Sequence, residues 1–115
     1  MTTEDCYRRI GADYQDVLRR LGTEERVRRF LIKFPEDTCY ADLRRALTEG
    51  NGEEAFRAAH SLKGICMNLG FSSLYRSVNA LTEELRSGQI RPEALSLSGQ
   101  VQEDYDAVIQ SIGIL

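Results

Sequence analysis

Residues 51–70 read NGEEAFRAAHSLKGICMNLG, and they contain His60, the only histidine of the 115-residue chain. On a helix that turns about 100° per residue, the apolar residues of this stretch fall on one broad stripe. The stripe consists of Ala55, Ala58, Ala59, Leu62, Ile65, Cys66 and Leu69. His60 projects from the opposite side, so burial of the stripe in a core leaves the imidazole in solvent.

The outer face around His60 also carries Phe56, Lys63, Gly64 and Met67. A glycine inside a helix costs about 1 kcal/mol relative to alanine, so we expect its missing side chain to leave room for a partner. The chain has thirteen arginines and two lysines, yet a lysine stands at position 63. An ammonium group is a compact point charge that suits a phosphate oxygen.

A lone helical histidine is more often structural than functional, but structural histidines mostly lie in a core or at a helix end with a partner. His60 is expected in mid-helix on the solvent-exposed side, which favours its interpretation as an accessible nucleophile. Isolated surface hydrophobic residues need no explanation. Phe56 and Met67, however, flank this histidine, and with Arg57 we interpret them as a docking patch. Phe71 and Tyr75 fit either the patch or the core.

The run Ala59-His60-Ser61-Leu62-Lys63-Gly64, followed by Gly70, Leu74, Ala80-Leu81 and Glu84-Leu85, resembles the histidine-containing phosphotransfer domains of two-component phosphorelays. The resemblance covers nearly the whole chain. It implies that His60 is phosphorylated, that Lys63 assists the phosphoryl group and that Gly64 opens access. It also implies a polar assisting residue on the neighbouring helix, for which no single residue stands out. The implied partners are a response-regulator receiver domain, which brings the catalytic aspartate and the metal, and a sensor or hybrid histidine kinase.

The chemistry that the residues allow is that of a carrier. A neutral imidazole can attack a phosphoryl group and hold it as a phosphoramidate. The sequence has no glycine-rich phosphate loop, no kinase signature and no evident magnesium-binding acid cluster. We therefore expect no autonomous kinase activity, no cofactor and no metal. One alternative is a docking module that uses the same patch without being phosphorylated. Another is a metal- or cofactor-binding bundle, which one histidine disfavours.

Length, charge and cysteine content limit the possible classes of protein and partner. The length suits one domain over residues 1–115, and the net charge of −3 spreads without a basic stripe, which argues against nucleic acid as a partner. Cys6, Cys39 and Cys66 fit neither a disulfide framework nor a zinc site. No apolar run is long enough to span a membrane, and residues 1–12 are charged, unlike a signal peptide. A cytoplasmic monomer is expected.

Helix signals predict an all-α fold, an up-down-up-down antiparallel four-helix bundle with a short N-terminal helical lid. Residues 2–11 and 13–21 form the lid. Thr23 caps a first bundle helix with an apolar stripe, and Pro35 stops or kinks it. Asp37 caps a second helix that ends at Gly50. Residues 51–70 follow, with Asn51 and Glu54 as a capping box, then helices over 72–86 and from Pro92 onward. The stripe of the first helix is Val27, Phe30, Leu31 and Phe34.

Overall fold

The computed structural model describes residues 2–115, and all regular structure in that range is helical, as the sequence predicts. Met1, the first residue of the expected domain, lies outside the described residues. The elements in chain order are α1 (Thr3–Arg9), α2 (Tyr14–Leu21), α3 (Glu24–Lys33), the 3₁₀ turn η1 (Phe34–Glu36), α4 (Cys39–Glu49), α5 (Gly52–Leu69), α6 (Ser72–Leu85) and α7 (Pro92–Gly113).

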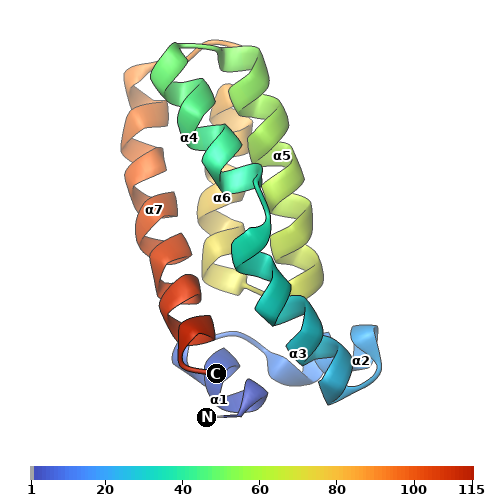
Figure 1. Cartoon of the computed structure of the whole chain (residues 1–115). Coiled ribbons are helices and arrows are strands. Elements are labelled where there is room, and N and C mark those ends of the chain that lie inside the picture. Colours follow the sequence, from blue (N-terminus) through green and yellow to red (C-terminus); the bar gives the residue numbers. More distant parts are fainter. Residues whose placement is uncertain (1) are drawn as a thin grey trace.

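Helices α4, α5, α6 and α7 form the four-helix bundle, in which successive helices run antiparallel (Figure 1). The prediction that residues 24–34 form a separate bundle helix is wrong. Helix α3 continues the course of α4 beyond the bundle, and η1, which contains Pro35, connects the two (Figure 1). Helices α1 and α2 lie at the same end of the bundle and form the lid: α1 lies next to the end of α7, and α2 lies beside α3 (Figure 1).

Local hydrogen bonds explain where α4 begins and ends. The N-cap position of α4 is held by Thr38 rather than by the predicted Asp37, and the Thr38 side chain makes no capping bond. The Asp37 carboxylate, one residue earlier, accepts a hydrogen bond from the backbone N–H of Cys39 at 2.8 Å and so satisfies the first donor of the helix. Gly50 ends the helix in the left-handed conformation, with φ of 73°. A glycine adopts this conformation without the steric cost that a Cβ atom would impose.

The start of α5 shows half of the expected capping box. The Asn51 side chain accepts from the Glu54 backbone N–H at 3.1 Å. The reciprocal bond is replaced because the Asn51 N–H donates to the Ala46 carbonyl at 2.9 Å, and the Glu54 carboxylate pairs with Arg57 instead. The helix still has a satisfied first turn, so its start lies where the sequence predicts.

The lid fastens the other end of α5. The buried Tyr7 hydroxyl donates to the Leu69 carbonyl at 2.7 Å, and the Arg20 guanidinium donates to the carbonyls of Met67 and Asn68 at 2.9 and 3.0 Å. The last carbonyls of a helix lack the usual partner four residues on, so the lid supplies hydrogen bonds to them, in addition to the one that the Met67 carbonyl accepts from the Gly70 N–H at 3.3 Å. Arg20 is thus a structural residue rather than a solvated surface charge.

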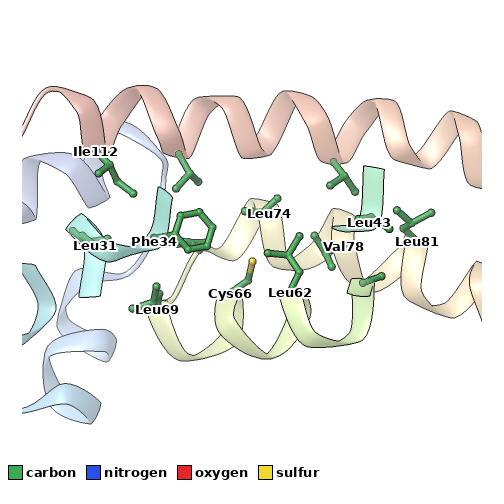
Figure 2. Packing of buried hydrophobic residues seen from close by; sticks show 14 of the residues in the cluster. Leu31, Phe34, Leu43, Leu62, Cys66, Leu69, Leu74, Val78, Leu81 and Ile112 are labelled. Atoms are coloured by element: carbon green, nitrogen blue, oxygen red, sulfur yellow. The ribbon is translucent and has the colours of Figure 1, made fainter. Parts of the chain in front are cut away.

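One continuous core runs through the bundle (Figure 2). Phe71 belongs to this core, because it is 1% exposed and its ring packs edge-on against the ring of Phe34, with the two ring centroids 5.0 Å apart. Tyr75 is half-buried. Phe30, expected to face inward, is 46% exposed and instead lines an apolar groove with Ile65. The core residues labelled in Figure 2 are Leu31, Phe34, Leu43, Leu62, Cys66, Leu69, Leu74, Val78, Leu81 and Ile112. Within residues 2–115, none of the helices has the length and apolarity needed to span a membrane.

Candidate functional site

Helix α5 places His60 on the outer surface of the bundle. The apolar stripe on the other side of the helix packs as its periodicity predicts. Its buried members are Ala55, Ala59, Leu62, Cys66 and Leu69, and the half-buried ones are Ala58 and Ile65. His60 is exposed, about halfway along an 18-residue helix whose two ends are both held by hydrogen bonds. The imidazole therefore stands in solvent on a rigid support.

An aromatic ring lies beside the imidazole. Phe56, one turn earlier on α5, is stacked with His60 at a centroid distance of 5.9 Å and an interplanar angle of 20°. The guanidinium of Arg86, which follows the last residue of α6, lies over the same Phe56 ring at 5.4 Å. Phe56 is half-buried, so it is more covered than the bare side chain that the sequence analysis expected. His60 and Arg86 thus flank one ring.

The Arg86 guanidinium is held by a carboxylate. Glu83, one turn earlier on α6, accepts hydrogen bonds from Arg86 Nε at 3.1 Å and from a terminal nitrogen at 2.8 Å. These bonds lower the pKa of the Glu83 carboxyl, and the charges of Arg86 and Lys63 lower it further. The same pair raises the pKa of Arg86. Lys63 is half-buried rather than fully exposed, because it lies towards α6.

The surface beyond His60 is open where the sequence predicts room. A Cβ atom built on Gly64 has no neighbouring heavy atom within 4 Å, so this position is clear of other side chains. Met67 is 53% exposed. A partner that approaches the imidazole along the outer face of α5 therefore meets one apolar side chain and an empty position.

Arg57 is exposed, but its charge is already paired. Its guanidinium lies 3.5 Å from a Glu53 carboxylate oxygen and also pairs with Glu54, all on the first turns of α5. It lines a polar groove between α4 and α5, together with Asp42 and Arg45. Arg57 therefore lies next to His60 as part of an ion-pair network and not as a free cation.

Sequence reasoning missed Glu83 and Arg86. Their spacing of three residues is a recognisable helical ion-pair signal. That signal does not say which face of α6 turns towards α5, because the register between the two helices depends on packing of the whole core. Glu83 lies in the last turn of α6, the helix that follows α5, and Arg86 comes directly after that helix.

The arrangement suits nucleophilic chemistry on the imidazole. A ring nitrogen of a neutral imidazole carries a lone pair, and here the ring is open to solvent. Two cations, Lys63 and Arg86, lie on the α6 side of this surface, and Arg86 is bound to Glu83. Among residues 2–115 there is no group of three or more His, Cys, Asp or Glu side chains placed to hold a metal ion.

Comparison with known proteins adds one finding. Residues 27–111 match the family model described as the Hpt domain. The matched segment begins in α3, leaves out α1 and α2, and contains all of α5 and α6. Searches of curated proteins and of solved structures returned no match.

Proposed function

The chain belongs to the Hpt domain family, and on this premise we propose that it is a phosphorelay carrier that is phosphorylated on His60. Hpt domains take part in histidine phosphotransfer in two-component signalling, with receiver domains and histidine kinases as partners. The observation that carries the assignment is that the chain's one imidazole is exposed in mid-helix, inside the matched segment.

The proposed step is transfer from an aspartyl phosphate of a receiver domain. A ring nitrogen of His60 attacks the phosphorus, the acyl phosphate P–O bond breaks, and the aspartate leaves as a carboxylate. The imidazole loses its proton to solvent and keeps the phosphoryl group as a phosphoramidate. Lys63 offsets part of the added charge, and Gly64 leaves room for the receiver. The reverse step passes the group to the aspartate of a second receiver.

In this proposal the chain supplies the nucleophilic imidazole, with Lys63 and Gly64 beside it. The catalytic aspartate and the metal belong to the receiver, and a sensor or hybrid histidine kinase starts the relay. The chain then acts as a carrier without kinase activity of its own. We further propose that residues 1–115 act as one monomeric domain in the cytoplasm.

The proposed receiver-docking surface surrounds His60. Met67 offers exposed apolar area, and the half-buried Phe56 adds a ring beside His60. Arg57 forms ion pairs with Glu53 and Glu54, so a receiver that docks here would contact the three charged side chains as a group. A surface with an apolar centre and charged surroundings is typical of transient protein interfaces.

A two-stage transfer experiment tests the function. Receivers from a panel are phosphorylated with labelled acetyl phosphate, freed of donor and mixed with the chain, and label on the chain is measured over time. A second, unphosphorylated receiver is then added, and we expect the label to leave the chain and appear on it. The same receivers with their acceptor aspartate replaced by asparagine serve as controls. Tight binding to a receiver without any label on the chain would favour the docking-module alternative.

A further inference from the structure

Glu83 interacts with two cations, Arg86 and Lys63, on the α6 side of the surface that carries His60. It binds Arg86 through two hydrogen bonds, and it lies close enough to Lys63 for the ammonium charge to lower the pKa of its carboxyl. Arg86 in turn lies over the ring of Phe56, on which His60 stacks. The carboxylate therefore neutralises positive charge one aromatic ring away from the imidazole.

We propose that Glu83 restrains Arg86 and thereby shortens the lifetime of a phosphoryl group on His60. The inference rests on the proposed phosphorylation of His60 and adds a positioning residue to that site. When the phosphoryl group is present, its oxygens and the Glu83 carboxylate compete for the same guanidinium. Arg86 divides its time between the two anions, and Glu83 sets how much charge the phosphoryl group receives.

The direction of the effect follows from the chemistry of hydrolysis. Water attacks the phosphorus, the N–P bond breaks, and the imidazole leaves most readily when its other ring nitrogen is protonated. Positive charge near the ring disfavours that protonation, and it also stabilises the dianionic phosphoryl group. Removal of Glu83 frees Arg86 and Lys63 to act in this way, so it should slow hydrolysis.

A small-molecule donor tests this without any receiver. Phosphoramidate transfers its phosphoryl group to the imidazole: a ring nitrogen forms the new N–P bond, the N–P bond of the donor breaks, and ammonia departs with the imidazole proton as ammonium. After the donor is removed, loss of phosphohistidine is followed by ³¹P NMR. We expect Glu83→Gln to lengthen the half-life about two- to fivefold, the range for a partly exposed ion pair, and Arg86→Gln to shorten it by a similar factor.

Further variants separate restraint from a general structural effect. Glu83→Asp keeps the charge and should remain near the wild-type half-life. Glu25→Gln removes one negative charge from the Glu25–Arg29 pair on α3 and should change nothing. Glu83→Gln should have a smaller effect when combined with Arg86→Gln than alone, because the restraint needs its arginine. The effect should also shrink in 1 M salt, where charges are screened within about 3 Å.

The outcomes distinguish this inference from the proposed function. If no variant and no wild-type protein forms phosphohistidine with phosphoramidate, the assignment of His60 as the acceptor fails. If phosphohistidine forms and Glu83→Gln decays at the wild-type rate, the acceptor stands and the restraint is overturned. Equal effects of Glu83→Gln with and without Arg86 would also overturn it, since Glu83 would then act without the arginine.

Discussion

His60 owes its setting to three neighbours that act differently. Phe56 lies stacked against the ring, Lys63 brings a positive charge one turn away, and Gly64 contributes empty space. None of the three is needed to bury the apolar stripe of α5, since all lie outside the fully buried set. Lys63 and Gly64 can therefore be changed with little effect on the core, which makes their proposed roles separable by mutation, whereas Phe56 also packs against the core.

Lys63→Ala should slow phosphotransfer or shorten the phosphohistidine half-life by about two- to fivefold, the range for a partly exposed charge. The reason is the loss of an ammonium group that offsets the charge of the phosphoryl dianion. Rates of transfer to and from a receiver, with the half-life in buffer, measure the effect. Lys63→Arg is the matched control, because it keeps the charge. Unchanged rates in both directions for Lys63→Ala would remove the role assigned to this residue.

Gly64→Gln should leave the free energy of unfolding equal or raise it by up to about 1 kcal/mol, because a helical glycine is replaced by a good helix former. It should nevertheless depress transfer from a receiver, since the new side chain fills the open position near the imidazole. Gly99→Gln is the matched control: Gly99 lies within α7 and also has open space around it, so its replacement should leave transfer unchanged. A Gly64→Gln protein that is less stable and fully active would show that Gly64 serves backbone packing.

At the scale of elements, α5 is held at both ends. The lid binds the last carbonyls through Tyr7 and Arg20. At the first turn, Gly52 packs directly against the backbone of Gly88 in the connection between α6 and α7. The imidazole in the middle is therefore carried by a helix whose position is set by contacts far from the reaction.

Gly52→Ala should destabilise the protein by about 1–3 kcal/mol, the usual cost of overpacking. A Cβ atom at this position would lie 2.0 Å from the Gly88 carbonyl oxygen, and backbone cannot yield as a flexible side chain does. Urea unfolding followed by circular dichroism measures the loss. Gly64→Ala on the same helix has no such neighbour and should be neutral or stabilising. Equal stability of Gly52→Ala and wild type would mean that this end of α5 is not tightly packed.

The sequence predicts the helices well where the signals are local. Thr23 caps α3 and Gly70 ends α5, because each conformation depends on residues within one or two turns. The burial of the α5 stripe and the exposure of His60 follow from the same local periodicity. These signals were enough to identify the helix that carries the candidate site and the side chain that it exposes.

What the sequence did not reveal depends on contacts between helices. Glu83 and Arg86 reach the surface near His60 only through the register of α6 against α5. Phe30 has the right spacing for a core residue, but it is 46% exposed and lines a groove with Ile65 of α5 instead of entering the core. A single sequence does not reveal which residues of different helices contact each other. Helical periodicity identifies an apolar face but does not say which element covers it.

In the molecule as a whole, the residues that stabilise the fold are different from those that carry the proposed chemistry. The core is continuous along an elongated molecule whose extents are 40 × 23 × 21 Å, and the lid closes one end of it. His60 lies on the side of this body, away from the lid and outside the core. Surface substitutions away from packed features usually change stability by no more than about 0.5 kcal/mol. Replacement of His60 should therefore abolish the proposed function and leave the fold unchanged.

The measurement that tests this most directly is the chemistry and location of the label that a phosphorylated receiver gives to the chain. We expect acid-labile, alkali-resistant phosphate at no more than one site per chain. His60→Gln should take up none, while its helical content, its melting temperature and its binding to the receiver stay close to wild type. Label that persists in His60→Gln, or label that survives acid, would contradict the assignment of His60 as the phosphorylated residue.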